Sequence, residues 1–144
     1  MPSMTVTRNI AAPPTRVFDA VSDVTRFAEI VPHILKVEFH SETRKGVGTR
    51  FRETRLMKGR EASTELEVTE YTENERVRFV ADTHGTVWDT VYTVRADGAG
   101  TLLSLTMEAR AYRWLPRLMN LFIMGMVRKF VEADLDVMQA HCEL

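Results

Sequence analysis

The sequence predicts an α+β fold in which an antiparallel sheet of seven strands packs against one long C-terminal helix. Two observations support this fold class. Between residues 34 and 111, turn signals recur so closely that only hairpins fit between them. After Arg113 the pattern changes to a long helical run that begins near Pro116 and ends near His141.

The N-terminal elements are predicted to be one strand and two short helices. Residues 4–10 alternate between polar and apolar side chains, which is typical of a half-buried strand. Pro13 and Pro14 end that strand, and proline suits the first turn of a helix. Asp23 can cap a second short helix, which Pro32 ends.

Six further strands are predicted between the short helices and the long one. The turns that separate them are Lys45-Gly46, Lys58-Gly59, Glu73-Asn74-Glu75, His84-Gly85 and Asp97-Gly98-Ala99-Gly100. A sheet with one apolar face must cover that face, and the C-terminal helix is the one predicted element long enough to do so.

Composition sets limits on the class of protein. The 144 residues are 44% hydrophobic and 27% charged, which predicts one globular domain over residues 1–144 that needs no disulfide or metal. The formal charge of −1, without a block of basic residues, argues against nucleic acid as a partner. Four histidines lack the spacing of a zinc site, so no metal and no cofactor is expected.

Location follows from the N-terminus and the cysteine content. Residues 1–10 do not have the charged leader and apolar core of a signal peptide. Cys142 is the only cysteine, so an internal disulfide is impossible and a reducing compartment fits best. We therefore expect a cytoplasmic protein.

Several short segments carry a resemblance to a known family. They are residues 10–18 (IAAPPTRVF), 21–23 (VSD), 37–38 (VE), 46–51 (GVGTRF) and the hairpin at 98–101, together with Pro32. With the order of elements, they resemble the START/Bet v 1-like (SRPBCC) superfamily and its polyketide cyclase/dehydrase-like branch. The resemblance covers nearly the whole chain. It implies a helix-grip fold, in which the curved sheet surrounds the long helix and leaves a cavity between them.

The cavity wall is predicted from strand alternation and from one stripe of the long helix. The strand residues 103, 105, 107 and 109 face inward together, and Val87 and Val91 leave open which face of residues 86–97 is buried. The expected ligand-binding residues are Phe51, Phe79, Trp88, Tyr92, Leu105, Met107, Met119, Phe122 and Met126. Each of them is equally consistent with an ordinary core, although flexible methionines suit a cavity of variable shape.

Four polar side chains are candidates for catalysis. Glu53 and Arg55 share the inward face of their strand with Phe51, and a buried ion pair is costly unless it is paired, hydrated or used. The alternative is that the strand twists and both charges reach water. His84 lies in a turn that can border the cavity mouth, or simply on the surface, and Tyr92 faces inward.

Residues 118–127 are apolar on nearly every side. This stretch is too short to span a bilayer, so stable membrane insertion is not expected. A homodimer contact or transient docking on a membrane are alternative explanations.

Three functions remain open at the level of sequence. The first is the binding of an apolar small molecule, such as a lipid, an isoprenoid or quinone, or a polyketide-like compound. The second is a polyketide cyclase or dehydratase that uses polar cavity residues for proton transfer. The third is a protein-interaction domain with a collapsed cavity.

Overall fold

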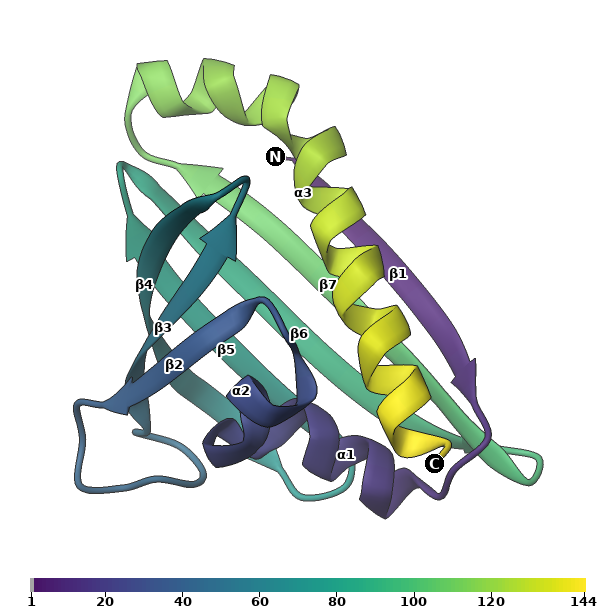
Figure 1. The fold of residues 1–144 in the computed structure, drawn as a ribbon. Helices are drawn as coiled ribbons and strands as arrows, with labels where there is room; N and C mark the ends of the chain where they lie inside the picture. Colours follow the sequence, from purple (N-terminus) through teal and green to yellow (C-terminus); the bar gives the residue numbers. More distant parts are fainter. Residues whose placement is uncertain (1) are drawn as a thin grey trace.

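The computed structural model describes residues 2–144, and Figure 1 shows a strongly bent sheet crossed by one long helix. In chain order the elements are β1 (Ser3–Ile10), α1 (Pro14–Ser22), the 3₁₀ turn η1 (Val24–Arg26), α2 (Phe27–Ile30), β2 (Ile34–Phe39), β3 (Arg50–Met57), β4 (Arg60–Thr72), β5 (Arg76–Thr83), β6 (Thr86–Asp97), β7 (Gly100–Ala111) and α3 (Trp114–Cys142). The α+β fold and the order of elements predicted from the sequence are confirmed.

The seven strands form one antiparallel sheet in the order β1-β7-β6-β5-β4-β3-β2. Strands β2 to β7 are therefore neighbours in sequence order, whereas β1 joins the far edge beside β7. Tight turns connect the hairpins at the predicted positions. The turn between β5 and β6 requires positive φ at two successive residues, 51° at His84 and 82° at Gly85, which is the geometry of a type I′ hairpin turn.

The helices α1 and α2 lie at one end of the sheet, where they close the space between β1 and β2 (Figure 1). Pro14 occupies the first turn of α1, where its missing N–H has no helical partner to lose. Asp23 ends this helix and caps η1, because its carboxylate accepts a hydrogen bond of 3.1 Å from the Thr25 backbone N–H.

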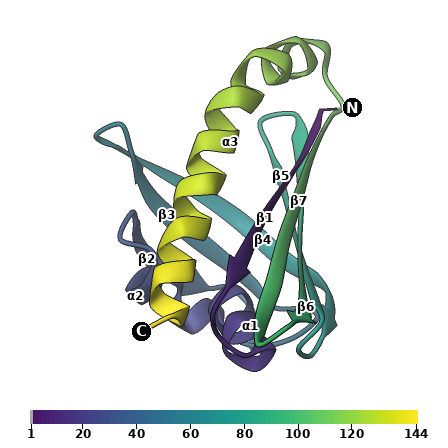
Figure 2. The same cartoon turned by 90° about the vertical axis from the view of Figure 1, so that its right-hand side faces the viewer.

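Helix α3 crosses the concave face of the sheet, with strands diverging on both sides of it (Figure 2). Its C-terminal half is anchored by buried residues that recur at helical spacing, namely Val131, Leu135, Met138 and Cys142. Its N-terminal part extends past the sheet at an angle to the rest of the helix (Figures 1 and 2). None of the helices across residues 2–144 has the length and apolar character needed to cross a bilayer.

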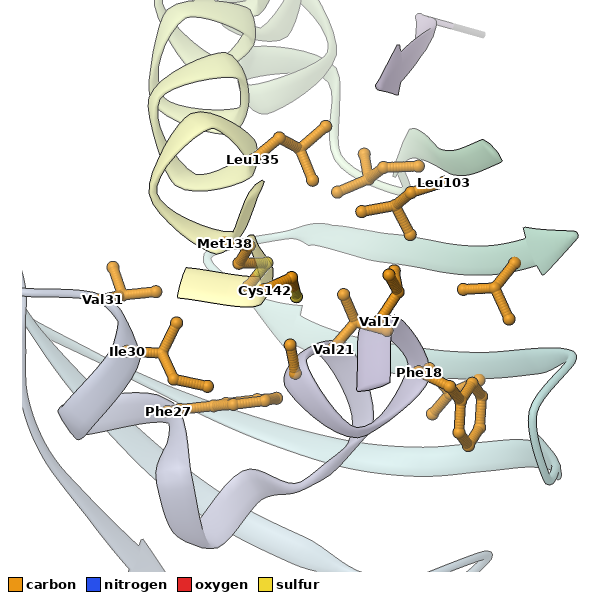
Figure 3. Close-up of a cluster of buried hydrophobic side chains, with 14 of the residues drawn as sticks. Val17, Phe18, Val21, Phe27, Ile30, Val31, Leu103, Leu135, Met138 and Cys142 are labelled. Atoms are coloured by element: carbon orange, nitrogen blue, oxygen red, sulfur yellow. The ribbon is translucent and has the colours of Figure 1, made fainter. Parts of the chain in front are cut away.

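The main core lies where α1 meets the C-terminal end of α3 (Figure 3). Val17 and Val21 of α1 face Met138 and Cys142 of α3, and all four side chains are buried. Burial of an aliphatic side chain of this size contributes about 1.5–3 kcal/mol. This core fixes the C-terminal half of α3 and leaves the middle of the helix to cover the remaining concave surface.

Candidate functional site

A cavity of about 290 Å³ lies between the concave face of the sheet and the middle of α3. Most of its lining side chains are apolar: Phe27, Ile34, Phe51, Met57, Leu66, Phe79, Ala81, Trp88, Leu105, Met107, Val127, Phe130, Val131 and Met138. Seven are polar: Glu53, Arg55, Thr64, Thr83, Thr90, Tyr92 and Asp134. This volume is near the lower end of the range for small-molecule sites.

Four aromatic rings form one wall of the cavity. Phe79 packs edge to face against Phe27, Phe51 and Tyr92, with ring centroids 6.0, 5.9 and 6.1 Å apart. Edge-to-face contacts fix ring orientation and add about 0.5–1.5 kcal/mol per pair beyond their burial. The aromatic wall therefore holds the Tyr92 ring in one position.

An ion network crosses the cavity from the sheet to the helix. Arg55 Nε donates to Glu53 Oε2 at 3.1 Å, while its two terminal nitrogens approach the Asp134 carboxylate at 3.2 and 2.8 Å. The two-point contact with Asp134 matches the planar guanidinium to the carboxylate. All three side chains are mostly shielded, with side-chain exposures of 23% for Arg55, 13% for Glu53 and 15% for Asp134.

The alternation of β3 explains this placement on the sheet side. Phe51, Glu53, Arg55 and Met57 follow at intervals of two and all line the cavity. Burial lowers the pKa of Arg55, but the carboxylates of Glu53 and Asp134 outweigh that effect and raise its pKa overall. With two carboxylates on one guanidinium, the ionised network has one excess negative charge.

Tyr92 is one of the polar groups available to a ligand, beside the hydroxyls of Thr64, Thr83 and Thr90. Burial, followed by the negative charge of Asp134, raises the pKa of its phenol, which is protonated at neutral pH. Among residues 2–144 the Tyr92 hydroxyl has no hydrogen-bond partner. A neutral phenol on a largely apolar wall can donate a hydrogen bond, so a ligand carbonyl or hydroxyl is a suitable partner for it.

A second recess of about 240 Å³ adjoins the cavity beside α3. His33, Leu56, Lys129 and Ala133 line it, together with four residues that also line the main cavity: Arg55, Met57, Phe130 and Asp134. The bridge between Arg55 and Asp134 therefore lies on the boundary between the two spaces.

The structure brings most of the predicted site residues to one wall and excludes others. Glu53, Arg55, Tyr92, Phe51, Phe79, Trp88, Leu105 and Met107 all line the cavity. The expected inward faces of β5, β6 and β7 are confirmed, because Ala81, Trp88 and Ala109 face the concave side as the alternation requires. The alternative that Glu53 and Arg55 both reach bulk water does not hold.

The prediction that Met119, Phe122 and Met126 face the sheet is wrong. They are 52%, 80% and 39% exposed, because this part of α3 extends past the end of the sheet (Figure 2) and directs Asn120, rather than these side chains, toward β6. The apolar pattern of this segment runs round the whole helix, so it could not define which side faces inward. His84 is also exposed, on the turn between β5 and β6, and does not line the cavity.

Sequence reasoning alone missed the helical half of the site. Val127, Phe130, Val131, Asp134 and Met138 line the cavity from α3. Their spacing of three and four residues was a usable signal, since a single aspartate on an otherwise apolar helical face needs a buried partner. Within residues 2–144 no cluster of metal-ligating side chains is present.

Comparison with known proteins places this geometry in context. The chain matches the family described as polyketide cyclase/dehydrase and lipid transport over residues 1–143. No curated protein sequence matches it.

Solved structures share the fold at low sequence identity. The di-domain ARO/CYC BexL from the BE-7585A biosynthetic pathway has a TM-score of 0.81 at 20% identity, over 99% of this chain and 50% of that chain. A major latex-like protein from Panax ginseng has a TM-score of 0.80 at 14% identity, over 98% and 97% of the two chains. A START superfamily protein from Mycobacterium smegmatis has a TM-score of 0.77 at 15% identity, over 98% and 97%. Because the family match spans almost the entire sequence, this protein belongs to the polyketide cyclase/dehydrase and lipid transport family.

Proposed function

We propose that the protein binds one apolar small molecule in the cavity between the sheet and α3, with a single polar group of that molecule placed at Tyr92. The observation that carries this proposal is the combination of a largely apolar wall with the partly buried Tyr92 phenol, which lines the cavity and has no hydrogen-bond partner among residues 2–144. Such a site gains affinity from apolar burial and orientation from one hydrogen bond. Isoprenoid or quinone, lipid and polyketide-like molecules have this chemistry.

The volume and charge of the cavity further restrict the class of ligand that it can hold. About 290 Å³ suits a compact or polycyclic molecule better than a fully enclosed long acyl chain. The excess negative charge of the ion network disfavours a ligand carboxylate beside Glu53 and Asp134. A neutral ligand with a carbonyl or hydroxyl group fits best.

The chain offers a built-in reporter of binding. Its two tryptophans are Trp88 on the cavity wall and Trp114 at the exposed start of α3. The Trp114→Phe variant therefore leaves one fluorophore at the site. Titration of this variant with an isoprenoid quinone, a fatty acid and an aromatic polyketide should give a saturable change in emission for at least one of them.

A matched pair of variants tests whether the ligand occupies this cavity. In the Trp114→Phe background, Val127→Phe adds bulk to the wall, whereas Met126→Phe adds bulk at the adjacent exposed position. We expect affinity to fall at least tenfold in the first variant and to stay within about twofold in the second, since a filled volume excludes ligand atoms. Equal affinity of the two variants would contradict the proposal.

Identification of the natural ligand uses the same protein without variants. Native mass spectrometry of protein purified from its own cell extract, followed by denaturing extraction, should reveal a bound neutral apolar molecule at one to one. A protein that is always empty and shows no thermal stabilisation by the panel would favour an interaction domain. The open cavity argues against that third possibility.

Cyclisation of a reactive ketide chain is the second candidate, and a specific arrangement favours it. Tyr92 can donate a hydrogen bond to a ketide carbonyl, and the Glu53 carboxylate, as the base, lies on the same wall. General acid–base groups of this kind contribute about 10²–10⁴-fold to rate. Glu53→Gln should then slow ring closure of a poly-β-ketone at least 100-fold with little change in affinity. Glu65→Gln, on the exposed side of β4, should change neither.

A further inference from the structure

The N-terminal part of α3 carries an apolar surface that no other element covers. The docking face, as it is called here, consists of Tyr112, just before the helix, and the exposed helical side chains Trp114, Leu115, Leu118, Met119, Leu121 and Phe122. Phe122, Trp114 and Leu121 are 80%, 76% and 65% exposed. Contiguous apolar surface of this kind usually marks a site of interaction. In Figures 1 and 2 this part of the helix projects beyond the strands, opposite α1 and α2.

The charges within the segment that carries the docking face are all positive, and the acidic neighbour in contact with it is Asp82 of β5, which accepts a hydrogen bond of 2.8 Å from the Tyr112 hydroxyl. Between Glu108 and Glu132 the sequence contains no acidic residue and five basic ones, Arg110, Arg113, Arg117, Arg128 and Lys129, in a chain of formal charge −1. Arg110 and Arg128 have acidic neighbours at 2.9 and 3.9 Å. Among residues 2–144, Arg113, Arg117 and Lys129 form no salt bridge.

This combination indicates what covers the face. A second copy of the chain would bring Arg113 and Arg117 against their own equivalents, and like charges at an interface are costly. An anionic bilayer surface instead offers negative headgroups to the arginines and an apolar layer to Phe122 and Leu121. Trp114 and Tyr112 have the amphipathic rings that are enriched at the membrane–water boundary.

Specific contacts hold the face in place relative to the cavity. Asn120 is buried and donates a hydrogen bond of 3.1 Å to the Thr86 hydroxyl at the start of β6. Gly85 lies so close to this segment that an added Cβ would meet Arg113 and Pro116 at 3.0 Å. Trp88, two residues after Thr86, and Val127, five residues after Phe122, both line the cavity.

We propose that residues 112–122 dock on the surface of an anionic lipid bilayer, with the N-terminal part of α3 lying along the headgroups and the adjacent end of the cavity turned toward the lipid. Docking in this way would let an apolar ligand pass between bilayer and cavity with little exposure to water. The proposal adds a membrane-association activity to ligand binding, and docking can be measured on protein without ligand.

Flotation with vesicles separates the contribution of the basic side chains to membrane binding from that of the apolar side chains. The protein should float with vesicles of phosphatidylglycerol and phosphatidylcholine, and much less with phosphatidylcholine alone. Arg117→Glu should weaken binding to the anionic vesicles by about fivefold or more, given the attraction of one basic residue to such a surface. Phe122→Ser should weaken it about tenfold, through the loss of a buried aromatic ring.

Matched variants elsewhere on the surface control for general effects. Arg95→Glu changes an exposed charge near the far end of β6, and Val47→Ser removes an exposed apolar side chain that is 61% accessible. Both should float like the original protein. All four variants should fold, because every substituted side chain is exposed. Circular dichroism and melting curves check this.

Trp114 supplies a second measurement that does not depend on affinity. In the Trp88→Phe variant it is the sole tryptophan, and its emission should shift to shorter wavelength with anionic vesicles and be quenched by brominated lipid. No flotation at low salt, or equal loss in the control variants, would overturn the proposal. Another result would also overturn it: Phe122→Ser abolishes a lipid-free dimer, or a complex with an acidic protein, but leaves flotation with anionic vesicles unchanged.

Discussion

Arg55 is the residue on which the polar part of the cavity depends. Its guanidinium bridges Glu53 and Asp134, and removing it leaves two carboxylates facing a largely apolar space. Because breaking a shielded ion network leaves unpaired charge, Arg55→Met should lower the free energy of unfolding by about 2–3 kcal/mol. Urea denaturation measures this change.

The control for this prediction lies three residues earlier on β3. Arg52 points to the opposite, exposed face of the same strand, so Arg52→Met should change stability by no more than about 0.5 kcal/mol. If both variants lost the same stability, the ion network would have no special role.

Asp89 makes the stability of the protein depend on pH. Hydrogen bonds from Arg78, and then from Arg110, lower the pKa of this carboxyl on the convex face of the sheet, although its burial opposes the shift. The unfolded chain has the ordinary, higher pKa, so it takes up the proton first as the pH falls. The stabilisation by Asp89 is therefore complete at neutral pH and is lost below about pH 4.

Asp89→Asn should accordingly be less stable than the original protein at pH 7, and this difference should shrink as the pH falls from about 5 to 3. Melting temperatures across that range measure the difference. Asp97→Asn, at an exposed position near the end of β6, is the matched control and should show a small difference at all pH values. A gap between Asp89→Asn and the original protein that is constant with pH would contradict the assignment.

At the scale of one residue, sequence reasoning found the sheet side of the site and missed the helix side. Alternation along β3 is a local signal, and it places Glu53 and Arg55 on the inward face without any knowledge of their partners. Asp134 lies 79 residues further along the chain from Arg55. Only the rotation of α3 about its axis brings this carboxylate to the guanidinium, and that rotation depends on tertiary packing.

Helix α3 shows why an element can be predicted while its orientation is not. Its length follows from a long helical pattern in which Pro116 lies in the first turn and no proline follows, and the observed bounds differ from the expected ones by only two residues at the start and one at the end. Where the run is apolar on all sides, however, no stripe is distinguished. The buried stripe is defined in the C-terminal half, where charged residues again alternate with Val131, Leu135 and Met138.

Gly125 is a weak point within this helix. No heavy atom lies within 4 Å of a Cβ built at this position, and its backbone has the ordinary negative φ of a helix. Gly125→Ala should therefore raise the free energy of unfolding by about 0.5–1 kcal/mol, through the lower helical propensity of glycine. Chemical denaturation provides the value.

Gly98 provides a control with the opposite sign. It also has open space around it, but its φ of +61° lies in the left-handed region. Gly98→Ala should therefore destabilise the turn between β6 and β7. If Gly125→Ala were also destabilising, α3 would need a flexible joint at that residue.

For the whole molecule, the class of fold was predictable because the turn residues, the strand alternation and the helical spacing all indicated the same architecture. Turn residues at Lys58-Gly59 and His84-Gly85, period-two strands and one terminal helix leave few other arrangements. The cavity was expected from the resemblance to a family, because a space between packed elements has no local sequence signal. The volume of the cavity and the partners in its ion network could be obtained only from the three-dimensional structure.

The sheet order determines when, during synthesis of the chain, the sheet can be completed. β1 pairs only with β7, so that Ser3 lies opposite Glu108, and α3 follows both along the chain. During translation the first strand must wait for the last one, and the concave surface stays open until the helix leaves the ribosome. A ligand present at that moment meets an uncovered half-shell, whereas a later ligand meets a cavity that α3 already covers on one side.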